Sequence, residues 1–217
     1  MLLDVACPEL TWAERAALGI GDRDGRLFAL REQTFGPRLD GFAECPQCAE
    51  GLEFDVAVDD LRATPAPGAE DNDYLMVGDL TLRFRLPDSR DLGAAAACLD
   101  AAAARRLVIE RCVLYASRDG VPVAASDLSE EILTRLGQRI VECDPRAEVL
   151  LDLRCPACGH GWQMLFDIAS YLWSELVAEA NRLLGEVHTL AQAYGWSEAD
   201  ILGMNARRRQ FYLEMLL

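Results

Sequence analysis

Two short motifs with the same pattern, Cys-Pro-x-Cys, are the residues of this chain best suited to chemistry. One motif runs from Cys45 to Cys48 and the other from Cys155 to Cys158. Each motif places two thiolates on a tight turn, and four thiolates from two such turns form a closed, tetrahedral zinc site of the structural kind. The motifs lie far apart in the sequence, so a shared zinc ion would join an early part of the chain to a late part.

Other interpretations of these motifs stay open. One turn of the pair could have lost its metal, or the motifs could be redox dithiols. A redox cysteine needs a helix N-terminus to lower its pKa, whereas both motifs adjoin predicted strands, which disfavours that interpretation. His160 follows the second motif and could replace a sulfur. Because four thiolates are at hand, we expect His160 to lie beside the ligands or in solvent.

The other four cysteines have no metal-ligand spacing. They are Cys7, Cys98, Cys112 and Cys143. In a cytoplasmic chain, such cysteines are more often small buried apolar residues than disulfide partners. We interpret all four in this way, while an oxidised pair among them stays open.

Nothing else in the sequence indicates catalysis. His188 stands on a predicted helix without an acidic or nucleophilic partner nearby. The chain contains no lysine, so it has no phosphate-binding GxxxxGK[ST] loop, and no serine stands in a nucleophile elbow. We therefore expect a protein that is not an enzyme, in which the metal supports the fold.

Length and hydrophobicity predict a globular protein. The chain has 217 residues, of which 51% are hydrophobic, enough for one large domain or two small ones. No apolar run reaches the length that spans a membrane, and the first residues lack the pattern of a secretory signal. We expect a cytoplasmic protein that does not enter a membrane.

The net charge of −15 limits the class of partner. Binding to a nucleic-acid backbone needs a cationic surface, which an acidic chain does not offer in general. The acidity instead favours solubility and basic protein partners.

The first third of the chain is predicted to be helical before the first motif and extended after it. A capping box opens a helix over residues 11–19, and Asp22 is the predicted N-cap of a second helix that continues to about Thr34. Residues 52–58 alternate between apolar and mostly acidic side chains, which predicts a half-buried strand.

The middle of the chain combines helices and strands. Residues 62–73 form a polar stretch with proline and glycine, and residues 80–86 alternate like a strand. An alanine-rich helix is predicted over 92–106, and 108–115 is compatible with either strand or helix. Residues 129–143 form a clear amphipathic helix.

A predicted strand at 149–153 leads into the second motif, as a strand follows the first. Two cysteine turns on paired β-segments are the layout of a zinc ribbon. We therefore predict an α+β fold in which a zinc-ribbon-like element is formed by two distant motifs, with a helical insertion and a helical C-terminal arm. Four parts are predicted. Residues 1–61 hold the N-terminal helices, the first motif and its strand, and residues 62–75 form a loop or linker. Residues 76–147 form an α/β insertion, and residues 148–217 hold the second motif and the C-terminal helical arm. We expect the metal to tie these parts into one compact unit.

The last third is predicted to be helical. Apolar residues recur at steps of four and three over about four heptads, which predicts a long helix with one apolar seam. The seam comprises Leu165, Ala169, Leu172, Leu176, Ala180, Leu183, Val187, Leu190 and Tyr194. A second capping box begins at Ser197, and Asn205 is the predicted N-cap of a final helix.

This C-terminal arm carries the candidate partner-binding residues. The apolar seam could pack in a core or dock on another subunit, and the sequence leaves both open. The candidates are the aromatic residues Tyr171, Trp173 and Trp196 together with Arg207, Arg208 and Arg209. Three cations in the first turn of a helix oppose the helix dipole, so carboxylates of this chain or of a partner are expected to hold them.

Three segments resemble a known protein family. The first is residues 129–167, in which a helix, an Asp-Pro pair, a strand and a Cys-Pro-x-Cys motif follow one another. The second is the ending, with Trp196-Ser197-Glu198-x-Asp200-Ile201-Leu202 followed by Arg207-Arg208-x-x-x-Tyr212-Leu213. The third is residues 30–37. This pattern resembles the phage baseplate hub assembly chaperones of T-even-type contractile tails and their relatives in contractile injection systems. The resemblance covers most of the chain in patches and is weakest at about 62–75.

The resemblance implies a small, non-enzymatic factor that helps build a baseplate by holding baseplate or tail proteins. Such a factor acts in the cytoplasm or becomes part of a tail-like particle. The alternative from the motifs alone is a zinc-ribbon adaptor that acts on nucleic acid or on the transcription machinery.

Overall fold

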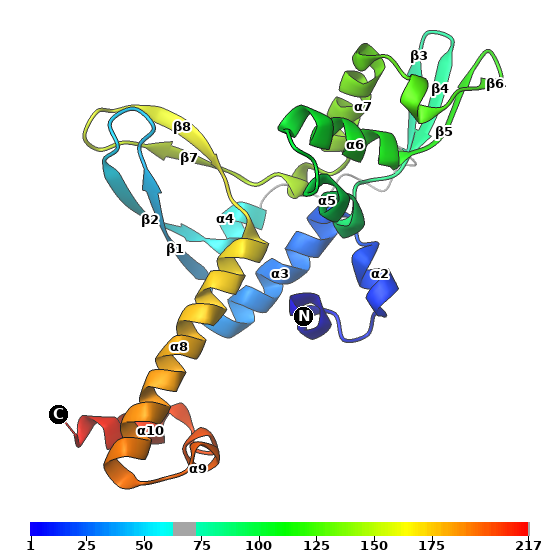
Figure 1. Cartoon of the computed structure of the whole chain (residues 1–217). Helices are drawn as coiled ribbons and strands as arrows, with labels where there is room; N and C mark the ends of the chain where they lie inside the picture. The colour runs from blue at the N-terminus through cyan, green and yellow to red at the C-terminus, as the bar shows by residue number, and fades with distance from the viewer. Residues whose placement is uncertain (63–72, 217) are drawn as a thin grey trace. The chain divides into compact units, whose positions relative to one another are not determined.

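A computed structural model describes residues 1–62 and 73–216 of the chain. The chain divides into two compact units, Met1–Ile168 and Ala169–Leu217, which we describe separately (Figure 1). Both helices and strands are present, so the predicted mixed fold is confirmed at this level. No helix in the described residues is long and apolar enough to span a lipid bilayer.

The first unit begins with three helices: α1 (Leu2–Ala6), α2 (Trp12–Ala16) and α3 (Ile20–Phe35). The predicted capping box is confirmed at the start of α2. The Thr11 hydroxyl oxygen accepts from the Glu14 amide at 3.3 Å, and the Glu14 carboxylate accepts from the Thr11 amide at 2.8 Å. Both hydrogen bonds are local, which explains why the sequence reveals them.

The predicted N-cap of the second helix, Asp22, is wrong. Helix α3 begins at Ile20 after Gly19, and Gly19 has no side chain that could cap it. The cap comes instead from Asp144, whose Oδ2 accepts from the Gly21 amide at 2.8 Å. A Cβ at Gly21 would lie 2.0 Å from Asp144 Oδ1, so only glycine admits this approach.

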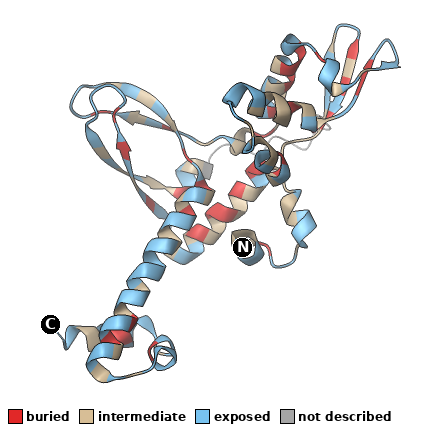
Figure 2. Cartoon of the chain, in the orientation of Figure 1, coloured by how far each residue is buried: buried red, intermediate tan, exposed pale blue. Residues whose placement is uncertain are grey.

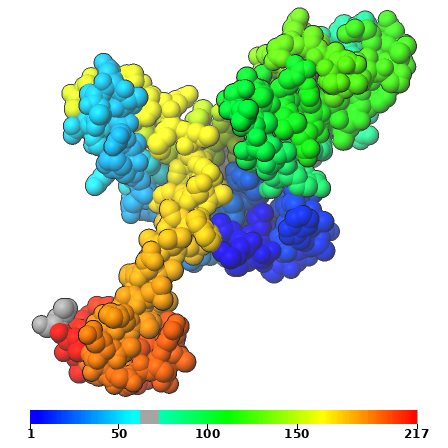
Figure 3. Space-filling model, in the orientation of Figure 1, coloured from blue at the N-terminus to red at the C-terminus, as the bar shows by residue number. Residues whose placement is uncertain are grey.

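Two β-hairpins carry the cysteine motifs. Strands β1 (Arg38–Glu44) and β2 (Gly51–Ala57) pair antiparallel, as do β7 (Leu150–Arg154) and β8 (Gly161–Leu165). Each motif lies in the turn between two strands. The hairpins lie side by side, β1–β2 in blue to cyan and β7–β8 in yellow (Figure 3). The short helix α4 (Val58–Arg62) follows β2.

The inserted region has a sheet and a core of its own. Its strands are β3 (Tyr74–Val77), β4 (Leu80–Phe84), β5 (Val113–Arg118) and β6 (Val121–Pro122), adjacent in that order. One face of the sheet packs on helices α6 (Ala101–Cys112) and α7 (Glu130–Cys143), where the buried residues gather (Figure 2). The core comprises Leu80, Leu82, Phe84, Ile109, Cys112, Ala116, Leu128, Ile132, Leu133, Leu136 and Ile140.

Several predicted boundaries in this region need correction. The single helix predicted at 92–106 is two helices, α5 (Ser89–Ala95) and α6, because the Asp100 carboxylate accepts from the Ala103 amide at 2.8 Å and starts a new helix. The ambiguous segment 108–115 ends α6 and begins β5. Of the loop predicted at 62–75, residues 63–72 lie outside the described part, while Arg62 ends α4 and Tyr74 begins β3.

A buried carboxylate joins α5 to its neighbours. Asp91 is fully buried and accepts two hydrogen bonds from the Arg85 guanidinium, at 2.6 and 2.9 Å, and one from Arg111 at 2.8 Å. The Asp88 amide adds a fourth at 3.0 Å. Burial would raise the pKa of Asp91. The hydrogen bonds, those from Arg85 first, outweigh burial and hold this pKa far below its usual range.

The second unit is helical. It contains α8 (Ile168–Tyr194), α9 (Glu198–Leu202) and α10 (Ala206–Glu214), and only the first residue of α8 belongs to the first unit. Its small core consists of Val187, Leu190 and Ile201, with Trp196 packed against it. The predicted caps are confirmed: Ser197 accepts from the Asp200 amide, and Asn205 from the Arg208 amide. Residues 177–182 of α8 are exposed, so the predicted seam is buried only in part (Figure 2).

The Asp91 network predicts a stability that depends on acid pH. Because the pKa of Asp91 is lowered on folding, its contribution is present above the unfolded value near 3.8 and is lost as pH falls toward the folded value. We expect Asp91→Asn to lower the free energy of unfolding by about 2–3 kcal/mol at pH 7. The difference from wild type should shrink as the pH is lowered below about 4. Urea titrations at several pH values measure it, and a difference that stays constant with pH would contradict the assignment.

The cap on α3 distinguishes two aspartates. Asp144→Ala leaves the Gly21 amide without its acceptor, so we expect a loss of about 1–2 kcal/mol of unfolding free energy. Asp22→Ala is the matched control, because Asp22 makes only an exposed ion pair with Arg146 at 2.7 Å, worth about 0–1 kcal/mol. Urea denaturation of both variants measures the effect. Equal losses would show that Asp144 is no cap.

Candidate metal centre

The two hairpin turns bring four thiols into one cluster. Cys45, Cys48, Cys155 and Cys158 place their sulfurs within 4.8 Å of one another. Two contacts cross between the hairpins: Cys45 Sγ to Cys158 Sγ at 3.7 Å and Cys48 Sγ to Cys155 Sγ at 3.6 Å. The cluster therefore joins residues that are 113 and 107 positions apart in the chain.

The spacing of the sulfurs fits one tetrahedral ion. Four sulfurs at about 2.3 Å from a zinc ion, at tetrahedral angles, lie about 3.8 Å apart. The two contacts between the hairpins are within 0.2 Å of that value. Four thiolates with no open position are typical of a structural zinc site, and the same donor set also suits iron. The residues present therefore fit a bound metal.

Both turns have the same backbone geometry, which positions the sulfurs. In the first, the Cys45 amide donates to the Glu50 carbonyl and the Ala49 amide donates to the Cys45 carbonyl, both at 2.9 Å. In the second turn, the Cys155 amide donates to the His160 carbonyl at 2.9 Å, and the Gly159 amide donates to the Cys155 carbonyl at 3.0 Å. The residue after each motif has a positive φ, 59° at Ala49 and 74° at Gly159.

A positive φ is easy for Gly159 and costs Ala49 about 1 kcal/mol. The first turn therefore keeps the same shape as the second against a local preference. The hairpin ladder and the thiol cluster are the interactions that can hold Ala49 in this conformation. No sequence rule about the motif itself indicates this strain.

The four thiols differ in their surroundings. Cys45 and Cys155 are buried, whereas Cys48 and Cys158 are exposed. The backbone amides of Cys158 and Ala157 stabilise the Cys155 thiolate, and the neighbouring thiols add to this, so its pKa falls to about 7. At Cys48 the Glu50 amide lowers the pKa, but the surrounding thiols, Cys158 first, and burial raise it to about 12 overall.

His160 takes no place among the clustered ligands. Its ring stacks on Trp162 with 6.1 Å between centroids, and its carbonyl accepts from the Cys155 amide. The histidine therefore supports the turn through its backbone. This agrees with the expectation that it lies beside the ligands.

The other cysteines are free thiols. Cys7 and Cys112 are fully buried, and Cys98 and Cys143 are partly buried. Burial raises the pKa of Cys112 to about 12, with the charge of Asp91 adding to the shift. A buried thiol with a raised pKa is chemically inert. For Cys112 this agrees with the interpretation as apolar filler.

The candidate partner-binding residues occupy different environments in the second unit. Trp173 is 47% exposed, and Tyr171 is partly buried. Trp196 stacks on Tyr194 at 4.5 Å between centroids and contacts Tyr212 edge-on at 4.8 Å, so it holds the unit together.

The arginine triplet is divided. Arg209 is buried, and its Nε donates to Glu186 at 3.0 Å while its Nη1 donates to the Met204 carbonyl. Arg207 and Arg208 are exposed, and neither forms an ion pair within residues 1–62 and 73–216. Their exposed neighbours Phe211 and Met215 have no signal that singles them out in the sequence.

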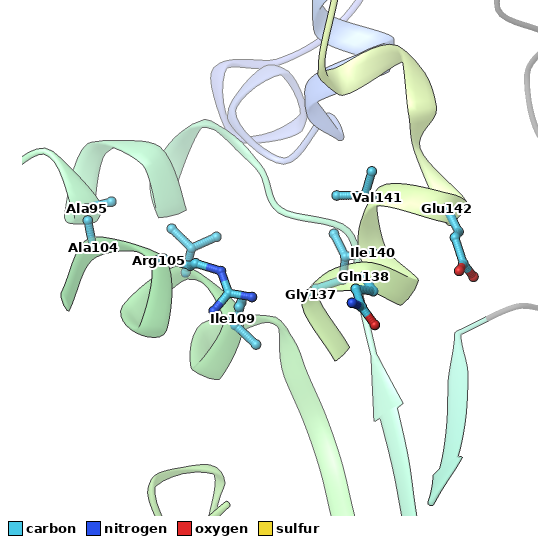
Figure 4. A pocket seen from close by; sticks show the side chains of 10 residues that line it. Ala95, Ala104, Arg105, Ile109, Gly137, Gln138, Ile140, Val141 and Glu142 are labelled. Atoms are coloured by element: carbon cyan, nitrogen blue, oxygen red, sulfur yellow. The ribbon is translucent and has the colours of Figure 1, made fainter. Parts of the chain in front are cut away.

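A hollow of about 640 Å³ lies between α5, α6 and α7 (Figure 4). Aliphatic side chains line most of it, including Val108, Ile109 and Val141. Its polar side chains are Arg105, Gln138 and Glu142, which include no nucleophile. The hollow does not suggest a reaction.

Comparison with known proteins identifies the family of this chain. A family model described as T4 bacteriophage base plate protein matches residues 7–173. The matched region contains all four clustered cysteines and ends in the first turns of α8. A search of curated proteins found no match, and a search of solved structures found none. Because the match covers well over half of the chain, the protein belongs to the T4 bacteriophage base plate protein family.

Proposed function

We propose that this protein is a non-enzymatic assembly or structural factor for the baseplate of a contractile, phage-tail-like particle, and that it acts by binding other proteins. The observation that carries the proposal is the family match over residues 7–173. A hub assembly chaperone is the specific role that we propose, in agreement with the resemblance of the motifs. The protein would act in the cytoplasm while the particle is built, or remain in the particle.

The four thiolates hold one structural zinc ion in this proposal. The support is their number, their spacing and the closed donor set. The metal forms its site only in the folded chain, so its binding energy stabilises the fold. The two hairpins then form a zinc-ribbon-like element, although they are separated by the whole inserted region.

The partner-binding surface in this proposal lies on the second unit. Most of that unit follows the family match, which ends at residue 173. Trp173 supplies an exposed aromatic side chain of the type enriched in binding hot spots. Tyr171 lies two residues before Trp173 on α8, and the exposed Arg207 and Arg208 on α10 offer further contacts. Trp196 and Arg209 keep the unit folded.

The metal proposal predicts one zinc ion per chain in elemental analysis of the purified protein. Cys48→Ser should lose the zinc and several kcal/mol of unfolding free energy, because three ligands hold zinc more weakly than four. Cys98→Ser is the matched control and should keep both. One iron per chain would correct the identity of the metal, and a protein without metal would contradict the site.

The partner proposal predicts that baseplate or tail proteins encoded beside this chain co-purify with it after co-expression. Trp173→Ala should weaken binding about 30-fold or more, as expected for a hot spot. Leu202→Ala, which is 44% exposed in the same unit, is the control and should bind normally. Absence of any tail protein, together with salt-dependent DNA binding, would favour the nucleic-acid adaptor instead.

A further inference from the structure

The outward face of the β1–β2 hairpin presents an aromatic ring among charged side chains. Alternate residues of a strand share a face. One face of this hairpin buries Leu39 and Ala43. The other face, here named the Phe42 face, is exposed along its length. It comprises Arg38, Asp40, Phe42, Glu44, Glu53 and Asp55.

The Phe42 face carries two carboxylates, those of Glu44 and Glu53, that no cation in the described part of the chain neutralises. Arg38 compensates Asp55 through a hydrogen bond of 2.8 Å. Glu44 and Glu53 form no ion pair with any described residue.

An exposed aromatic ring lies among these carboxylates. Phe42 is 62% exposed and stands opposite Glu53. A shallow hollow of about 550 Å³ on the hairpin is lined by Asp40, Gly41, Phe42, Glu53, Phe54 and Asp55. Acidic groups around an aromatic ring are complementary to cationic and apolar side chains presented together.

The cysteine turn itself does not require this acidic face. The second hairpin, β7–β8, has the same turn, but its outward face has Leu150 opposite Leu165. Its one carboxylate there, Asp152, accepts a hydrogen bond from Gln163 at 3.0 Å. The charge and the exposed ring are thus particular to β1–β2.

The same chain offers a surface of complementary chemistry on α10. Arg207, Phe211 and Met215 recur at steps of four, and Arg208 lies beside them, so one side of the helix presents all four. Phe211 and Met215 are each 60% exposed. We name these four residues the Arg207 face.

The described part of the fold provides no carboxylate for this face, and the Arg208 guanidinium lies over the Tyr212 ring, 5.8 Å from its centroid. Both arginines stand in the first turn of α10, where the helix dipole disfavours cations. Arg209 forms an ion pair with Glu186, whereas Arg207 and Arg208 form no ion pair with any described residue. In a chain of net charge −15, two exposed arginines next to an exposed phenylalanine and methionine form a distinct basic, apolar surface.

We propose that the Arg207 face of one copy binds the Phe42 face of a second copy. Guanidinium groups then meet Glu44 and Glu53, and Phe211 covers Phe42. The two faces differ, so each copy offers one of each, and association runs head to tail into a ring or an open chain. The repulsion between two acidic copies is screened beyond about 8 Å at physiological salt. This self-association goes beyond the proposed binding of other tail proteins.

The proposal is tested by sedimentation velocity of the full-length, zinc-loaded protein at about 0.3 mM, where weak complexes are populated. We expect concentration-dependent association of wild type. Phe42→Ser with Glu53→Gln removes one face, and Arg207→Gln with Arg208→Gln removes the other. Each double variant should weaken association at least tenfold. Asp152→Asn, with the same loss of charge on the second hairpin, and Arg135→Gln should associate like wild type.

A mixture of the two double variants gives the sharper result. Each variant retains the face that the other lacks, so an equimolar mixture has one intact contact per pair. The mixture should form dimers and nothing larger, while each variant alone stays monomeric. Zinc content and circular dichroism confirm that the variants fold. A monomeric wild type, or association that the variants leave unchanged, would overturn the proposal and leave the binding through Trp173 untouched.

Discussion

The cluster of four thiols is the constraint on which the first unit depends. It joins Cys45 to Cys158 across 113 residues, and neither hairpin buries enough apolar surface to be stable alone. By the chain-entropy relation for cross-links, a permanent link over such a loop is worth about 5 kcal/mol in the unfolded chain. A zinc ion on these thiols would supply this link in a reducing compartment, where a disulfide would not persist.

A second polar contact also joins an early part of the chain to a late part. Asp144 caps α3 at Gly21, and so it joins the first helices to the segment just before the second motif. Between these two long-range ties, the inserted region carries its own sheet and core, with Asp91 fixing α5 to the strand and helix beside it. The inserted region is therefore organised around its own apolar contacts, while the cysteine hairpins and α3 depend on interactions between distant residues.

This division explains which features the sequence predicts. The caps at Thr11, Ser197 and Asn205 are hydrogen bonds between residues three positions apart, so the local pattern is sufficient. The cysteine turns are local too, and their approach follows from the donor count that a metal needs. The local pattern predicts Asp22 as the N-cap of α3, because a local rule cannot foresee the Asp144 acceptor, 123 residues from Gly21.

The arginine triplet shows how one physical rule leads to two outcomes. Cations in the first turn of a helix need carboxylates, and the sequence indicates this need without indicating where the carboxylates are. Glu186 meets the need of Arg209 from within the unit, since α8 passes beside α10 there. No carboxylate among the described residues does so for Arg207 or Arg208. The arginine buried against its carboxylate stabilises the fold, and the two exposed arginines are those that the proposed contact between chains would use.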